Sequence, residues 1–233
     1  MKPTLLTEKT SFEIIPYTLK TLFKPSLTNT LKRQGNLEKF EDINVDEIMR
    51  TVRAMILDVD GTLTCGTEDF TPQIVEKLRE IKSKIPACVY CNQNYNWPVF
   101  EQLGIPVARH LPNKPDPHGF NVAMDLYLQP QIKNRSPLTA PAVAMVGDNY
   151  LTDGACRNIG MQFIHVKRHQ GPEDKFAKLL RQLGEGIAEF HRGVEKIKSL
   201  IPKRKSMTTH EHEGLHPLVK ALYEPSRKRD PLY

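Results

Sequence analysis

Short apolar runs alternate with amphipathic segments through the central part of the chain. Five runs have the length and composition of buried strands: 54–57, 87–91, 105–108, 142–147 and 163–166. Between them, Thr71 followed by Pro72 opens an apolar stripe, as at the start of a helix. Gly104 and Gly160 stand where a left-handed helix end is expected. Buried strands alternating with helices predict an α/β fold, Rossmann-like and doubly wound, with a mainly parallel sheet.

The two ends of the chain follow other patterns. Short helix candidates lie around Tyr17 to Phe23 and from Leu27 to Arg33. The pattern divides the chain into four parts: an N-terminal helical lead-in (1–50), the α/β domain (51–170), an amphipathic helical segment (171–204) and a basic, flexible tail (205–233).

The amphipathic segment has an apolar seam at alternating steps of four and three residues. Its members are Phe176, Leu180, Leu183, Ile187, Phe190, Val194, Ile197 and Ile201. We favour a helix packed on the sheet or on a partner helix, and a basic helix on an anionic membrane is the alternative. Glycines within the segment weaken a continuous helix in either case.

Polar side chains follow the expected strands where each one ends. They are Asp58 and Asp60, then Cys91 and Asn92, then Lys114, and finally Asp148 and Asp153. Because the carboxyl ends of parallel strands share one edge of a sheet, we expect these residues to gather there.

Four carboxylates beside one lysine are costly unless a cation is present. Hard oxygen ligands without histidine or cysteine favour Mg²⁺. Asp58 could attack phosphorus while touching the metal, and Asp60 could protonate the leaving oxygen and then activate water. Lys114 would offset phosphoryl charge and Asp148 would hold Mg²⁺. Asp153 is equally well placed to cap the helix that follows it.

Three sequence motifs carry a family resemblance. "DVDGT" after an apolar strand, "KP" at 114–115 and "GDNYLTD" from 147 resemble the haloacid dehalogenase (HAD) superfamily of phosphohydrolases over roughly residues 53–170. The resemblance implies Asp58 as nucleophile, Asp60 as general acid/base with its carbonyl on the metal, and Lys114 as charge stabiliser. It implies Mg²⁺ as cofactor, secured by Asp148 and Asp153.

Substrate recognition departs from the usual superfamily pattern in two places. A serine or threonine normally contacts the phosphate where Cys91 stands, so Asn92 is the candidate to replace it through its side-chain amide. Neither the stretch before Thr71 nor that before Lys114 can hold a large cap domain, and an open site suits a large substrate.

The capless layout is similar to the YqeG-type branch, which includes phosphatidylglycerophosphate phosphatases. The cues are "LTNTLKRQG" before the first motif, "CNQN" after the second strand and "VGDNYLTDGACRNIG"; the branch prefers asparagine at position 61 and serine at position 91. This resemblance implies a phosphorylated substrate with a lipid headgroup, met by peripheral association with a membrane. The alternatives are an open-site phosphatase for a protein or a soluble metabolite, and a non-catalytic binding or regulatory module.

The amino-acid composition excludes few classes of binding partner. The formal net charge of +6 suits anionic partners, but scarce aromatics in the basic tail disfavour a base-stacking platform, so no nucleic acid is predicted. No segment reads as a membrane span or a signal peptide. Four cysteines, with Cys88 and Cys91 on one buried strand, favour a reducing compartment, so we expect a cytoplasmic protein, peripheral at the inner membrane surface. The sequence assigns no oligomeric state.

One motif in the tail is misleading. "HEGLH", residues 212–216, matches a zinc-protease pattern that needs both histidines on one helix face. A central glycine and Pro217 directly after the motif oppose such a helix, so we expect solvated tail there.

Overall fold

The fold centres on one parallel sheet. The computed structural model describes residues 35–65, 69–93, 96–132, 136–169, 178–179 and 181–190. The sheet has five strands in the order β1-β5-β4-β2-β3, and every neighbouring pair is parallel. The strands are β1 (Gly35–Leu37), β2 (Ala54–Leu57), β3 (Ala87–Val89), β4 (Val143–Gly147) and β5 (Gln162–Val166). The expected α/β fold with a parallel sheet is confirmed.

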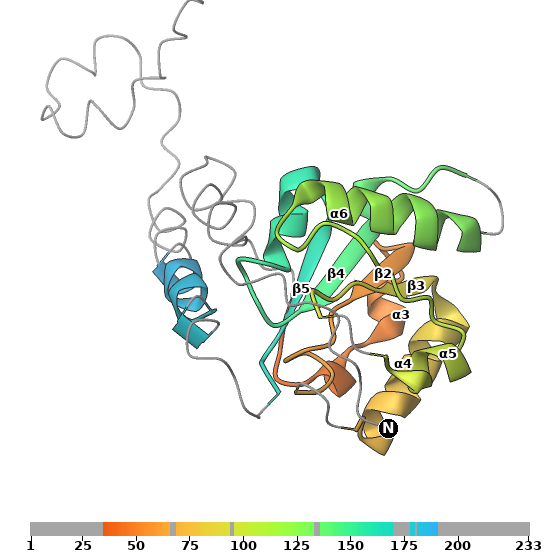
Figure 1. Cartoon of the computed structure of the whole chain (residues 1–233), viewed down its shortest axis with the longest axis horizontal. Helices are drawn as coiled ribbons and strands as arrows, with labels where there is room; N and C mark the ends of the chain where they lie inside the picture. Colours follow the sequence, from red (N-terminus) through yellow and green to blue (C-terminus); the bar gives the residue numbers. More distant parts are fainter. Residues whose placement is uncertain are drawn as a thin grey trace, which may run out of the picture. The chain divides into compact units, whose positions relative to one another are not determined.

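Helices cover both faces of the sheet (Figure 1). One face carries α3 (Val45–Ile48), α4 (Pro72–Lys84) and α5 (Pro98–Gln102). The other carries α6 (Pro117–Val122), which continues into the π-helical segment η3 (Ala123–Leu128). The shorter 3-10 turns are η2 (Phe40–Asp42), η4 (Gln129–Gln131), η5 (Ala140–Ala142) and η6 (Gly154–Ile159).

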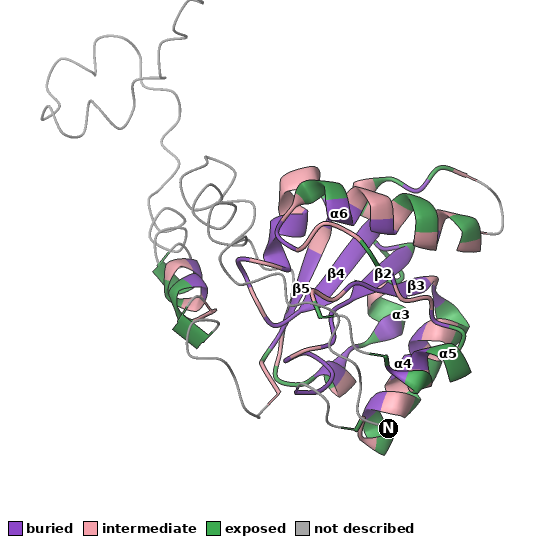
Figure 2. Cartoon of the chain, in the orientation of Figure 1, coloured by how far each residue is buried: buried purple, intermediate pink, exposed green. Residues whose placement is uncertain are grey.

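Helix α4 forms for the local reasons that the sequence predicts. The hydroxyl of Thr71 accepts a hydrogen bond from the backbone N–H of Ile74 at 3.3 Å, and Pro72 occupies the first turn. The side chains of Ile74, Leu78 and Ile81 are buried against the sheet, while the opposite side of the helix faces water (Figure 2).

The central strands bury side chains on both faces. In β2, Met55 and Leu57 enter the core under α4, whereas Ala54 and Ile56 enter the core under α6. All four are inaccessible to water. A strand enclosed on both sides is rigid, so the residues that follow it are held in fixed positions.

Two details of the sheet differ from the expectation. Residues 105–108 do not form a full strand: Val107 makes an isolated parallel bridge to Val89, next to Pro106, which has no N–H to donate. In contrast, β1 pairs with β5 at the opposite edge, although its sequence "GNL" carries little strand signal.

The predicted helix ends are confirmed at both glycines. Gly104 has φ of +64° and Gly160 has φ of +90°, in the left-handed region. The segment before Gly160 is helical, as expected, but with 3-10 geometry.

The ends of the folded domain lie beyond the range 51–170 assigned to it. Phe40, Ile43 and Val45 are buried in the core, so the part of the lead-in after residue 35 belongs to the domain. At the other end, the compact unit that contains the sheet extends to Arg192. The candidate helices at 17–23 and 27–33, the zinc-like motif and the basic tail lie outside the described residues.

The described part of the amphipathic segment packs on the domain. Residues 181–190 are helical, Ala188 is fully buried in the core under α6, and Gly184 lies against the side chain of Leu151. Only part of the apolar seam therefore faces the core: Ile187 packs on it, while Leu183 and Phe190 are exposed. No helix among the described residues is both long and apolar enough to cross a bilayer.

Cys88 lies in β3, and Cys91 lies two residues after the end of this strand. Cys88 is buried in the core under α6, and Cys91 packs on the core under α4, so the two thiols point to opposite faces. All four cysteines of the chain are free thiols.

Candidate active site

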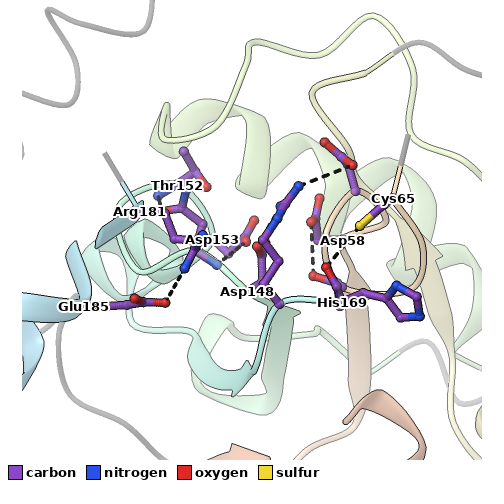
Figure 3. A network of polar contacts seen from close by, with 12 residues as sticks. Asp58, Cys65, Asp148, Thr152, Asp153, His169, Arg181 and Glu185 are labelled. Atoms are coloured by element: carbon purple, nitrogen blue, oxygen red, sulfur yellow. Dashed lines mark hydrogen bonds and ion pairs between the residues drawn. The ribbon is translucent and has the colours of Figure 1, made fainter. Parts of the chain in front are cut away.

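Three aspartates meet at the carboxyl edge of the sheet. Asp58 directly follows β2, Asp148 directly follows β4, and Asp153 stands at the start of η6. One oxygen from each lies within 4.8 Å of the others, and all three residues are buried. Figure 3 shows them within a polar network that includes Cys65 and His169 as well as Thr152, Arg181 and Glu185.

Lys114 supplies the main positive charge of this cluster. Its ammonium donates to Oδ1 of Asp58 at 2.6 Å and to Oδ1 of Asp153 at 2.5 Å, and its side chain is only 3% exposed. Burial alone would lower the pKa of Lys114, but the charges of Asp153 and Asp58 hold that pKa well above its usual value. The neighbouring carboxylates therefore favour the charged form of Lys114.

The loop after β3 fixes the backbone of Lys114. The side-chain oxygen of Asn92 accepts from the Lys114 N–H at 2.8 Å, and its amide group donates to the Lys114 carbonyl at 3.1 Å. Tyr90 donates to the carbonyl of Pro112, which lies two residues before Lys114. The centroid of the Tyr90 ring lies 5.7 Å from the Lys114 ammonium. The amide of Asn92 is thus used to position Lys114, a contact that the sequence did not suggest.

Asp153 is placed by a close approach of two backbone segments. A Cβ on Gly147 would lie 2.3 Å from the Asp153 carboxyl group, so only glycine fits at the end of β4. Oδ2 of Asp153 accepts from the backbone N–H of Asn149 at 3.1 Å, and the side chain makes no cap hydrogen bond to η6. The helix-cap alternative for Asp153 is therefore wrong.

Asp60, the second aspartate of "DVDGT" (motif I, residues 58–62), lies beside the cluster. Asp60 is one third exposed, and its Oδ1 lies 4.0 Å from Nη2 of Arg168. Nη1 of Arg168 donates to Oδ2 of Asp148 at 3.0 Å, so one guanidinium links the two carboxylates. Asp60 thus faces water while its neighbours are enclosed.

Two further residues contact these aspartates: Thr62 contacts Asp58, the candidate nucleophile, and His165 contacts Asp148, a candidate metal ligand. The Thr62 hydroxyl donates to Oδ2 of Asp58 at 3.2 Å. Nε2 of His165, on β5, lies 3.1 Å from the carbonyl oxygen of Asp148, and its ring stacks on Tyr150 at 4.3 Å. A carbonyl oxygen can only accept, so Nε2 carries the proton.

Two of the buried carboxylates, Asp148 and Asp153, resist ionisation. Burial raises the pKa of Asp153 to about 7, against the opposing effect of Lys114. Burial and the charges of Asp153 and Asp58 also raise the pKa of Asp148, and Arg168 counteracts them. A cluster of this kind gains stability from additional positive charge.

The sequence identified most of the residues that meet here. Asp58, Lys114, Asp148 and Asp153 are in one cluster, with Asp60 beside it. Cys91 lies near Asp58, and burial followed by the charge of Asp58 raises the pKa of its thiol to about 12, so it is a neutral thiol.

Sequence reasoning missed Tyr90, His165 and Arg168. Arg168 could have been found, because it follows the last strand of the sheet just as Asp58 and Asp148 follow theirs. Tyr90 and His165 reach the site through contacts with residues distant in the sequence, for which the sequence carries no local signal.

The residues present fit a hard divalent cation. All three ligand candidates are carboxylates, without a sulfur or nitrogen donor, and their spacing brings three oxygens together around a small ion. Among the described residues this is the one cluster with such a composition. The arrangement joins a candidate nucleophile, a candidate metal site and a buried ammonium group, which are the groups that phosphoryl transfer uses.

The fold and this cluster define a phosphatase of the haloacid dehalogenase type. A family model described as mitochondrial PGP phosphatase matches residues 16–167, more than half of the chain. The protein therefore belongs to the mitochondrial PGP phosphatase family.

Solved structures show weaker likenesses. The core domain of a protein named as a phosphoglycolate phosphatase, from Streptococcus pneumoniae TIGR4, is 22% identical with a TM-score of 0.34, over 57% of this chain and 95% of its own. A protein named as a YrbI family phosphatase, from Pseudomonas syringae pv. phaseolica 1448a, is 14% identical with a TM-score of 0.33, over 69% and 98%. The comparison with curated proteins gave no match. The family assignment rests on the family model alone.

Proposed function

We propose that this phosphatase hydrolyses a phosphomonoester through an aspartyl-phosphate on Asp58, with Mg²⁺ as cofactor. One observation carries the proposal: a carboxylate at the end of a buried strand lies within 4.8 Å of two others and is paired with a buried lysine. No group in the described part of the chain has a better combination of nucleophile, cation and metal ligands.

Asp58, Asp148 and Asp153 would hold the metal. Their oxygens suit Mg²⁺. Burial raises the pKa of Asp148 and of Asp153, so the charged forms of these two carboxylates are disfavoured without a cation. When bound, the ion would neutralise charge on the phosphoryl oxygens. The carbonyl of Asp60 is a further ligand candidate.

The remaining steps belong to the protein. The carboxylate of Asp58, held by Lys114 and Thr62, attacks phosphorus and forms an O–P bond as the bond to the leaving oxygen breaks. Asp60 gives its proton to that oxygen, and then takes a proton from the water that attacks the aspartyl-phosphate. Inorganic phosphate leaves, and both carboxylates return to their initial state.

The proposed role of Asp60 is supported by its exposure. A group that exchanges protons with a leaving alcohol and then with water must reach both, and Asp60 is one third exposed while the other carboxylates are enclosed. Lys114 stays charged throughout and stabilises the phosphoryl group.

The proposed substrate is phosphatidylglycerophosphate at an anionic membrane surface. The family name supports this headgroup and a mitochondrial location, where the sequence had suggested the cytoplasm and the inner membrane surface. The absence of a long insertion between Asp60 and Thr71 supports a bulky substrate, and the net charge of +6 supports peripheral contact with anionic lipid. The exposed side chains of Leu179 and Leu183 are candidates for that contact.

A phosphate-release panel tests both the chemistry and the substrate. The unchanged protein and Asp58→Asn are assayed with Mg²⁺ on phosphatidylglycerophosphate in vesicles, on a phosphopeptide and on sugar phosphates. We expect the lipid to be preferred and Asp58→Asn to be inactive on every substrate, because an amide is no nucleophile. Equal turnover of soluble phosphates would favour the soluble-substrate alternative. No turnover by the unchanged protein would favour a binding module, and full activity of Asp58→Asn would exclude the mechanism.

A further inference from the structure

A guanidinium group from the segment after β5 contacts the metal-ligand candidate Asp148. Nη1 of Arg168 donates to Oδ2 of Asp148 at 3.0 Å, and the Arg168 side chain is 14% exposed. We propose that Arg168 is a positioning residue for the metal centre, which holds Asp148 by one oxygen so that the other is presented to the cation. This inference rests on the Mg²⁺ site of the proposed function.

Backbone hydrogen bonds attach the segment that carries Arg168 to its neighbours. The N–H of Lys167 donates to the carbonyl of Leu37 at 2.9 Å, and the N–H of His169 donates to the carbonyl of Gly61 at 2.7 Å. The thiol of Cys65 also donates to the carbonyl of His169 at 3.1 Å. Because residues on both sides of Arg168 are fixed, its side chain starts from a defined position over the motif-I loop.

The motif-I loop leaves space for the guanidinium at one glycine. A Cβ on Gly61 would lie 2.0 Å from Nη1 of Arg168 and 2.6 Å from Oδ2 of Asp148. Gly61 also has φ of +86°, which strains any other side chain. The bond between Arg168 and Asp148 therefore lies directly against the backbone of the loop that carries the nucleophile.

The two oxygens of Asp148 have different surroundings. Both oxygens of Asp58 are occupied, by Lys114 and Thr62, and both oxygens of Asp153 are occupied, by Lys114 and Asn149. Among the described residues, Asp148 has a partner only at Oδ2, which is Arg168, although its side chain is just 4% exposed. Oδ1 of Asp148 is thus available to a cation, in addition to the oxygens of Asp58 and Asp153.

Two effects of Arg168 on the metal oppose each other. Its positive charge repels a cation, but without it the Asp148 carboxylate could turn its free oxygen towards the Lys114 ammonium in the same cluster. Orientation should win, because partners that orient metal ligands commonly account for about 10–100-fold in metal affinity.

The test measures Mg²⁺ binding itself. Full-length protein and its Arg168→Met variant are titrated with MgCl₂ by isothermal calorimetry, after thermal unfolding without metal has shown that both are folded. We expect the variant to bind Mg²⁺ about 10–100-fold more weakly. Arg168→Lys, which keeps the charge, should recover part of the loss. Arg168→Gln, which keeps one N–H donor, should do so too and replaces Arg168→Met if that variant does not fold.

Lys167→Met is the matched control. It removes the same charge one residue earlier, where Lys167 is 70% exposed and, among the described residues, pairs with Glu38 alone, at 3.0 Å on the surface. It should bind Mg²⁺ like the unchanged protein.

The outcomes separate this inference from the proposed function. Unchanged or tighter Mg²⁺ binding by Arg168→Met would overturn the positioning role, and so would an equal loss in Lys167→Met. Asp148→Asn tests the site itself, since it should lose Mg²⁺ binding altogether. If Asp148→Asn bound Mg²⁺ normally, the metal site and the proposed function would fail, whatever Arg168 does.

Discussion

The buried charge centre and the rim of this site are built differently. The charge centre consists of Asp58, Lys114, Asp148 and Asp153, whose side chains are at most 6% exposed. The rim consists of Asp60, Cys91 and Asn92, and the Asp60 side chain is 33% exposed. In the centre, Lys114 pairs with Asp58 and Asp153, and Asp58 and Asp148 directly follow buried strands, whereas the rim residues are partly exposed to water. In the proposed mechanism the centre carries the chemistry, and the rim is where the leaving group would approach.

The largest effect is expected when the cation of the charge centre is removed. Lys114→Met leaves Asp58 and Asp153 without their shared ammonium group, so we expect turnover to fall to background. Without Mg²⁺, the free energy of unfolding should fall by about 3–5 kcal/mol, because buried carboxylates lose their partner. Phosphate release and urea unfolding measure the two effects.

Lys84→Met is the matched control for that change. Lys84 pairs with Asp46 and Glu80 at the surface, where water and salt screen the charges, so neither turnover nor stability should change. Equal stability of Lys114→Met and the unchanged protein would contradict the account of the charge centre.

The second test is the pH dependence of the metal-free protein. Burial raises the pKa of Asp153 from 3.8 to about 7, so its contribution to stability is complete below about pH 4 and is lost as the pH rises through 7. The loss should amount to at most about 4 kcal/mol. The gain in melting temperature on adding Mg²⁺ should therefore be larger at pH 8 than at pH 5. Asp153→Asn should reduce this difference, with the remainder due to Asp148, whose pKa is also raised, and a gain that is independent of pH in the unchanged protein would contradict the prediction.

A smaller effect is expected where the rim supports the centre. Asn92→Ala removes two hydrogen bonds to the Lys114 backbone, so turnover should fall by about 10-fold while Mg²⁺ affinity is unchanged. Asn96→Ala, which removes a contact with Arg109 in an exposed loop, should have no effect. A loss of Mg²⁺ binding in Asn92→Ala would show that rim and centre are not separable.

The smallest effect is expected at Cys91. Cys91→Ser replaces a weak thiol donor by a hydroxyl group, so the KM for the substrate should fall by no more than about threefold, with kcat unchanged. Initial-rate kinetics on one substrate measure both. A large change in kcat would assign Cys91 to the charge centre.

The sequence predicted the site where the chemistry follows a strong local pattern. Asp58 and Asp148 stand directly after long apolar runs, and parallel strands bring such positions together, so their meeting followed from the pattern alone. The start of α4 at Thr71 and the left-handed turns at Gly104 and Gly160 were equally local.

Features that depend on distant partners could not be predicted in this way. β1 exists because the edge of β5 offers it hydrogen bonds, and its own three residues carry no strand signal. Asn92 and Lys114 are 22 residues apart, and nothing near Asn92 indicates that its amide clamps a lysine backbone. The position of Arg168 after β5 was visible in the sequence, but its contacts with Asp148 and Asp60, which follow other strands, were not.

The most direct test of the central claim is to trap the phosphorylated enzyme. Asp60→Asn should slow the hydrolysis of the intermediate, because an amide cannot activate water. After mixing with substrate and Mg²⁺ and rapid acid quenching, mass spectrometry should find a phosphoryl group on the peptide that contains Asp58. Treatment with hydroxylamine, which cleaves acyl phosphates, should remove it. Turnover without any adduct, or an adduct on Asp148 or Asp153 in place of Asp58, would contradict the account.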